Sequence, residues 1–200
     1  DGIDDFIVGA NGDNNNPSGL LGRAFIFYGP ITGSNPLASD TEADVILDGE
    51  SVFDDFGEKV AAAGDFNNDG LSDVIVGGLF ANDITHSAYI FFGRDTGNSQ
   101  LILAAKADAN VVITRPIPDI NFSVSVASAG DFNNDGIDDV IVGASGRSTD
   151  DPGQAYIYFG STSINSQLVL QDTDANVILT GRNIRSSFGF SASPAGDFNG

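Results

Sequence analysis

A nine-residue acidic pattern, D-x-N-x-D-G-x-x-D, recurs along the chain and has the residue types of a cation-binding loop. Two copies are continuous, Asp65 to Asp73 and Asp131 to Asp139. A third copy is divided, since residues 197–200 supply its first part and residues 1–5 its second. Oxygen-bearing side chains at positions 1, 3 and 5 let a tight loop direct three donors at one point, and the glycine at position 6 permits the sharp turn.

The donors of this pattern favour Ca²⁺. All are hard oxygen ligands without Cys or His, and Mg²⁺ would demand a tighter octahedron. Position 7 can contribute only its backbone carbonyl, and the Asp at position 9 closes the shell. The predicted metal ligands are Asp65, Asn67, Asp69, Leu71 and Asp73 in the first loop, Asp131, Asn133, Asp135, Ile137 and Asp139 in the second, and Asp197, Asn199, Asp1, Ile3 and Asp5 in the divided loop.

Two other interpretations apply to such a pattern. Asp, Asn and Gly also populate ordinary turns, but three copies with ligand-type residues at all four positions favour a metal site. An EF-hand would need a Glu at position 12 and flanking helices. Here position 12 is Val76, Val142 or Val8, each inside a strand-like apolar run, so we expect each loop to join two strands.

The spacing of the pattern predicts a single repeat domain over residues 1–200. The first Asp of each copy falls at 65, 131 and 197, and these positions lie 66 residues apart. Counted through the divided loop, the remaining interval is 68 residues. A fixed long period of this kind is the signature of a repeat architecture.

Each repeat holds four apolar, β-favouring runs separated by turn residues, and none shows sustained helical periodicity. Four short strands per repeat are typical of a propeller blade. We therefore predict an all-β fold, a β-propeller of four-stranded antiparallel blades with three blades in this chain, whose aromatic side chains fill the spaces between blades. The predicted strands are 6–10, 24–29, 43–47 and 56–61, then 74–78, 88–93, 109–113 and 122–127, then 140–144, 155–160, 175–179 and 188–193.

Composition excludes several classes of partner. The 200 residues carry a net charge of −20, with 8 Lys and Arg against 28 Asp and Glu. Nucleic acid and anionic membrane surfaces are therefore unfavourable partners. No apolar run is long enough for a transmembrane helix, and we expect no signal peptide in this sequence. Loops of this kind fill where calcium is millimolar, so we expect an extracellular or cell-surface protein.

Catalytic residues are sparse, so we expect no enzyme. The one histidine, His86, lies in a connection without a nucleophile pattern, and there is no Cys. Neighbouring carboxylates such as Asp138 and Asp139 alternate faces on a strand and do not form a glycosidase pair. Binding would then use the connections after the first and second strands of each repeat. These are 11–22, 79–87 and 145–153, and 30–42, 94–108 and 161–174.

The order of Phe56-Gly57, the loop 63–70 and the run 73–78 resembles the FG-GAP repeat of integrin α-subunit propellers and their bacterial relatives. The resemblance extends over all three repeats. It departs at Phe122-Ser123, where the glycine is lost, and at residues 192–195. It implies a propeller with Ca²⁺ in the loops that lead into the first strand of each blade, and partner binding through other loops.

Three blades cannot close a ring, so the divided loop suggests a partner. Its halves would meet on a second copy or on a longer chain, giving a head-to-tail oligomer or a filament. We therefore carry three functional hypotheses. The first is a calcium-stabilised adhesion module that binds protein or carbohydrate, the second is a self-assembling structural unit, and the third is the accessory propeller of a larger enzyme.

Overall fold

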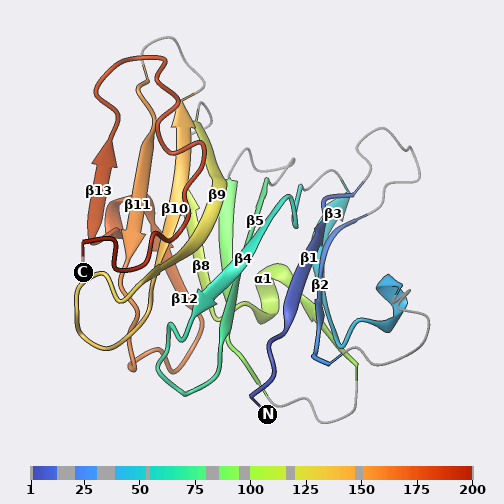
Figure 1. Ribbon diagram of the computed structural model, residues 1–200. Coiled ribbons are helices and arrows are strands. Elements are labelled where there is room, and N and C mark those ends of the chain that lie inside the picture. The colour runs from blue at the N-terminus through green and yellow to red at the C-terminus, as the bar shows by residue number, and fades with distance from the viewer. Residues whose placement is uncertain are drawn as a thin grey trace.

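Three β-sheets stand side by side in an arc, and each is the counterpart of one predicted blade (Figure 1). The computed structural model describes residues 2–12, 21–30, 39–52, 55–79, 86–94, 100–115, 120–146 and 151–199. The predicted connections therefore lie partly outside the described residues, as does the predicted ligand Asp1.

The first blade is a sheet of four strands in the order β1-β2-β3-β7. Strands β1 (Phe6–Ala10), β2 (Leu21–Phe27) and β3 (Val45–Val52) follow one another antiparallel. The outermost strand, β7 (Leu101–Ala104), comes from the next repeat and runs parallel to β3. A 3₁₀ turn, η1 (Asp40–Glu42), precedes β3.

The second blade has five strands and the same plan. Its antiparallel members are β4 (Lys59–Gly64), β5 (Asp73–Leu79), β6 (His86–Phe91) and β8 (Val111–Arg115). Strand β12 (Leu168–Gln171) of the third repeat joins the outer edge, parallel to β8. The short helix α1 (Ala105–Asp108) lies between β7 and β8 in the chain.

The third blade holds four antiparallel strands. These are β9 (Ile120–Gly130), β10 (Asp139–Gly146), β11 (Gln154–Tyr158) and β13 (Val177–Thr180), with β13 at the outer edge. The 3₁₀ turn η2 (Asp172–Asp174) separates β12 from β13.

The all-β class and the antiparallel blades are thus confirmed, and eleven of the twelve predicted runs contribute to strands. Two expectations need correction. The blades are not purely four-stranded antiparallel sheets, because β7 and β12 add a parallel strand where we predicted only surface connections. The predicted strand 188–193 does not form. Only Phe188 makes an isolated bridge, to Gly153, and Phe190 is 67% exposed, because no strand of the described residues pairs with this segment.

Aromatic side chains fill the spaces between blades, as predicted. Phe56 meets Tyr89 edge-to-face at 5.6 Å between ring centroids, and Phe122 meets Tyr156 in the same way at 5.7 Å. In each pair both rings belong to one blade, and the rings pack in a core cluster shared with the neighbouring blade. Tyr89 clusters with Leu47 of the first blade, and Tyr156 clusters with Ile90 of the second. Close packing of this kind needs small residues: a Cβ on Gly9 would overlap the carbonyl oxygen of Gly57. The core therefore consists of separate clusters, one between the first and second blades and one between the second and third, and the acidic loops lie at one set of strand ends.

Candidate metal-binding loops

The Asp65–Asp73 loop curls around its own first carboxylate. Asp65 accepts hydrogen bonds from the backbone N–H groups of Asp69 and Gly70, both at 2.9 Å. The Asn67 side-chain oxygen shares the Asp69 N–H at 3.0 Å, and Asp69 accepts from Leu71 N–H at 2.9 Å. The side chains at positions 1, 3 and 5 are therefore gathered on the inside of one turn, as the pattern predicts.

The second loop repeats this arrangement. Asp131 accepts from the N–H groups of Asp135 and Gly136, both at 2.8 Å, and Asn133 shares the Asp135 N–H at 2.8 Å. Asp135 in turn accepts from Ile137 N–H at 2.9 Å. Two copies of the motif, with nearly identical flanking sequence, thus adopt one conformation.

Position 6 requires glycine because of its backbone angle. Gly70 has φ +90° and Gly136 has φ +88°, in the region that side chains disfavour. A Cβ at either glycine would meet no atom within 4 Å, so the requirement comes from the backbone and not from crowding. The preceding residues, Asn68 and Asn134, also have positive φ, a conformation that Asn tolerates better than most residues.

The Asp at position 9 is the buried member of each loop. Asp73 is 1% exposed and Asp139 is fully buried. Asp73 accepts from Phe66 N–H at 2.9 Å and from Gly93 N–H at 2.8 Å, and so ties its loop to the end of β6. Burial raises the pKa of the Asp73 carboxyl to about 7, against these two hydrogen bonds, which lower it. A buried carboxylate of this kind gains most from a nearby positive charge.

Asp139 has the equivalent contacts. It accepts from Phe132 N–H and from Gly160 N–H, both at 3.0 Å. Burial again raises the pKa of its carboxyl above the ordinary range, and the hydrogen bonds oppose the shift. The two intact loops therefore agree in the geometry and in the electrostatics of their last ligand.

The donor set of each intact loop suits a hard cation. Carboxylate and amide oxygens are the ligands that Ca²⁺ prefers. Within the described ranges, no three acidic, His or Cys side chains are arranged as a metal-binding group. Asn67 instead donates its side-chain N–H to Asp69 at 2.8 Å, and Asn133 donates to Asp135 at 2.9 Å. A cation bound by the carboxylate of Asp69 or Asp135 would take the place of the asparagine N–H that contacts this carboxylate.

The halves of the divided loop do not meet within this chain. Asp5 accepts from Gly29 N–H at 2.9 Å, the contact that Asp73 makes with Gly93, so the second half is placed as in an intact loop. The backbone of Ile3 precedes it. The half with Asp197 and Asn199 follows the third blade, and Figure 1 shows the two chain ends apart.

One residue of the loops escaped sequence analysis. Asp138, at position 8 of the second loop, accepts a hydrogen bond from the backbone N–H of Asp65 at 2.8 Å and thereby links the two loops across a blade boundary. A side chain on Gly64 would overlap this carboxylate. The signal in the sequence is a recurring acid at position 8, Asp138 and Asp4, whereas sequence analysis weighs Asp138 only as a partner of Asp139 in a carboxylate pair.

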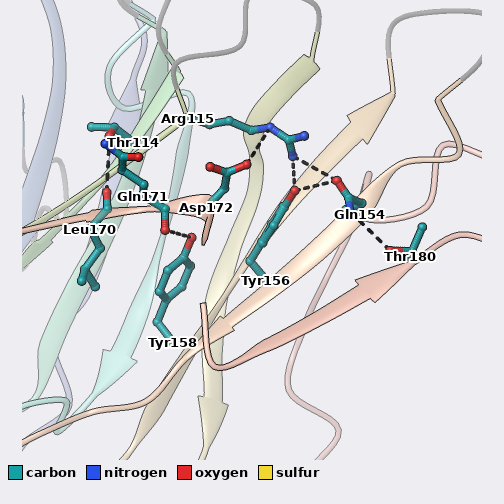
Figure 2. A network of polar contacts seen from close by, with 9 residues as sticks. All are labelled: Thr114, Arg115, Gln154, Tyr156, Tyr158, Leu170, Gln171, Asp172 and Thr180. Atoms are coloured by element: carbon teal, nitrogen blue, oxygen red, sulfur yellow. Dashed lines mark hydrogen bonds and ion pairs between the residues drawn. The ribbon is translucent and has the colours of Figure 1, made fainter. Parts of the chain in front are cut away.

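A second polar cluster lies away from the loops, where the second and third blades meet (Figure 2). The buried Arg115 forms an ion pair with Asp172 at 3.3 Å and donates to the hydroxyl of Tyr156 and to Gln154. Burial raises the pKa of Tyr156 to about 12, so the phenol stays protonated near neutral pH. This cluster joins blades, and it has no nucleophile poised for reaction.

None of the helices in the described part of the chain has the length and the hydrophobicity needed to span a bilayer.

Comparison with known proteins relates the blades to a recurring unit. Residues 122–158, which run from β9 to β11, match the FG-GAP repeat. Integrin alpha-7 of Mus musculus is 29% identical over 78% of this chain, and integrin alpha-5 of Xenopus laevis is 28% identical over 80%. Phosphatidylinositol-glycan-specific phospholipase D of Homo sapiens is 28% identical over 96% of the chain. The chain spans only 12%, 14% and 23% of the lengths of these three relatives.

Proposed function

We propose that this chain, an FG-GAP, integrin α-like propeller-type domain, is a calcium-stabilised extracellular module for adhesion or ligand binding. Ca²⁺ would be held in the intact loops by Asp65, Asn67, Asp69 and Asp73, with the carbonyl of Leu71, and by the equivalent set Asp131, Asn133, Asp135, Ile137 and Asp139. The cation would neutralise carboxylates that otherwise repel one another.

The observation that carries this proposal is the buried carboxylate at the end of each loop. Asp73 and Asp139 lie almost without solvent contact beside two further acids of their own loop. Turn formation alone does not require a buried acid at this place. A divalent cation would compensate both the burial and the repulsion, and in that state the loop would clamp the two strands that it joins.

The ligand-binding part of the proposal rests on the relatives. Integrin chains cover most of this sequence, which suggests a propeller that binds protein or carbohydrate through its connections. The name phospholipase D belongs to an enzyme, but the matched part is 23% or less of those proteins. We therefore propose a non-catalytic role, with the accessory part of a larger enzyme as a weaker alternative.

Thermal unfolding with and without calcium tests the structural role of the ion. A ligand that binds only the folded state adds RT ln(1 + [L]/Kd), about 2.7 kcal/mol at a hundredfold excess over Kd. We expect the melting temperature to rise with Ca²⁺ and to rise much less with equal Mg²⁺. Equal melting temperatures in calcium and in chelator would exclude this role.

Calcium stoichiometry, measured by isothermal titration, locates the sites. Asp69→Asn and Asp135→Asn keep the size and one oxygen of the side chain but remove a charge, so each variant should lose one of the strong sites. The control is Asp48→Asn, on β3, whose carboxylate pairs with Arg23 at 2.8 Å outside the loops. Unchanged stoichiometry in both loop variants would contradict the assignment.

A second proposal is that the divided loop joins two copies. It is favoured by the placement of Asp5 on Gly29 N–H and by apolar side chains near both ends, since Phe6 is 47% exposed and Phe198 is 92% exposed. Asp197 and Asn199 of one copy would complete the set Asp1, Ile3 and Asp5 of the next. Sedimentation should show an oligomer or filament in Ca²⁺ that dissociates in chelator. A monomer in both conditions would exclude it.

A further inference from the structure

The outer edges of two blades are completed by a strand that the following repeat supplies. Strand β7 of the second repeat pairs in parallel with β3, and β12 of the third repeat pairs in parallel with β8 (Figure 1). Both strands share the sequence Gln-Leu-x-Leu, in which the glutamine immediately precedes the strand. The two copies are Gln100 to Leu103 and Gln167 to Leu170. The supplied strand is therefore a repeated device of this fold.

The first residues of the supplied strand make the same contacts in both blades. Leu101 N–H donates to Asp44 C=O at 2.8 Å, and Leu168 N–H donates to Asn110 C=O at 2.9 Å. The preceding glutamine side chain donates twice to backbone carbonyls of the turn before the receiving strand. Gln100 reaches Thr41 at 3.2 Å and Ala43 at 2.7 Å, and Gln167 reaches Lys106 at 2.7 Å and Ala109 at 2.8 Å.

The receiving turn is built in the same way in all three blades. An Asx side chain accepts from a backbone N–H of the neighbouring strand's end: Asp44 from Tyr28 at 2.7 Å, Asn110 from Phe92 at 2.9 Å and Asn176 from Phe159 at 2.8 Å. The backbone N–H of each of these residues donates to Ile26, Ile90 or Ile157 at 2.9 Å. The third receiving turn, around Asn176, is thus already formed.

In the third blade this turn and the strand that follows it carry no supplied strand. Sheet pairing in the described part of the chain ends at β13 on this side. Ile178 is 48% exposed and Leu179 is 40% exposed, whereas their counterparts in the second blade, Val112 and Ile113, are 5% and 0% exposed. The edge of β13 is unpaired in the described residues, its face is apolar, and the turn before it already presents backbone carbonyls as acceptors. These are the features that strand addition requires.

We propose that β13 is a strand-addition site that takes, in parallel, a Gln-Leu-x-Leu segment of a further FG-GAP-type repeat. The glutamine would bind the carbonyl groups of the turn that ends at Ala175, and the leucine N–H would bind Asn176 C=O. The second leucine would cover the apolar face beside Leu179, as Leu103 is buried in the first blade. Selectivity follows from the glutamine, whose side-chain amide supplies two N–H donors, one for each carbonyl.

Binding of a peptide to the intact chain tests this site. The probe is residues 100–108, Gln-Leu-Ile-Leu-Ala-Ala-Lys-Ala-Asp, with blocked ends and a fluorescent label, titrated in calcium-containing buffer and followed by anisotropy. Amide hydrogen exchange of the chain then reports where the peptide lies. We expect saturable binding and slowed exchange at Val177–Thr180, with exchange at Val45–Asp48 unchanged.

Three peptide variants distinguish specific recognition from nonspecific hydrophobic binding. Gln100→Ala removes two hydrogen bonds and should weaken binding about fivefold or more. Leu101→Pro removes the leading N–H and should abolish binding. Ile102→Ala is the matched control, since Ile102 is 59% exposed in β7, and should change affinity less than about twofold.

Several results would overturn the proposal. These are no binding at about 1 mM peptide, equal affinity of the Gln100→Ala peptide, or slowed exchange at the edge of β1 in place of β13. The outcome is independent of the calcium proposal, because the receiving turn contains none of the proposed ligands.

Discussion

The phenylalanine at position 2 of the acidic pattern shows how one motif residue differs between copies. Phe66 is 1% exposed and packs among side chains of the second and third blades, whereas Phe132 is 57% exposed. The carbonyl of Phe66 also accepts from Ser161 N–H at 2.9 Å. Identical motif residues therefore contribute very different amounts to stability.

This contrast gives a matched pair of substitutions. Phe66→Ala should lower the free energy of unfolding by about 3–5 kcal/mol, because it empties a buried ring site. Phe132→Ala, at the same motif position, should cost less than about 1 kcal/mol. Chemical denaturation of both variants measures the difference, and equal losses would contradict the packing described for Phe66.

The backbone at position 6 supports a second prediction at this scale. Gly70→Ala should lower the free energy of unfolding by about 1–2 kcal/mol, since alanine in a left-handed conformation is strained while its Cβ meets no neighbour. The neighbouring Asn68 has φ +57°, so Asn68→Gly is the control and should be neutral or stabilising. A neutral Gly70→Ala would mean that the loop relaxes into another turn.

At the scale of the element, the acidic loops are coupled across a blade boundary by Asp138. Asp138→Ala leaves the Asp65 N–H without its partner, so we expect a loss of about 1–3 kcal/mol in chemical denaturation. Ser72→Ala is the control at the same position of the preceding loop, where the side chain is exposed, and it should stay within about 0.5 kcal/mol. Asp138→Asn keeps an acceptor and should recover part of the loss.

The strands show which elements sequence analysis can find. Runs such as 6–10 and 140–144 were predicted because β-branched residues and flanking turn residues mark them locally. β7 was missed because Leu101–Ala104 is short and leads directly into the helical residues Ala105–Asp108. Its partner β3 lies far back in the sequence, so no local pattern reveals the pairing.

The same reasoning explains the strand that was predicted and does not form. The segment 188–193 has the apolar pattern of β4 and β9, but a strand is stable only beside a partner. β4 and β9 pair with β5 and β10, which follow each of them in the chain. The apolar pattern therefore indicates that a segment can form a strand. The strand forms only where another strand is available to pair with it.

The loops were the more predictable part of the candidate site. The spacing of oxygen donors and the glycine gave the turn, and the structure has these side chains inside it. The burial of Asp73 and Asp139 could not be read from spacing, because it comes from Gly93 and Gly160 at the ends of other strands.

At the scale of the whole molecule, charge is the dominant property. With a net charge of −20 on 200 residues, the folded chain repels itself at low ionic strength. In chelator, raising NaCl from about 10 mM to about 500 mM should raise the melting temperature, since the Debye length shrinks from about 30 Å to below 8 Å. The calcium-loaded protein should gain less, because bound cations already neutralise the loops. Equal gains in both states would argue against cation binding at these acids.

The supplied strands also decide in what order the molecule becomes complete during synthesis. The first blade has its own β1, β2 and β3 early, yet its last strand, β7, leaves the ribosome only after β4, β5 and β6. The unit that is duplicated in the sequence is therefore not the unit that folds. Any recombination event that joins repeats at their sequence boundaries must therefore bring a compatible Gln-Leu-x-Leu segment. Without it, the sheet of the preceding repeat would lack its outer parallel strand.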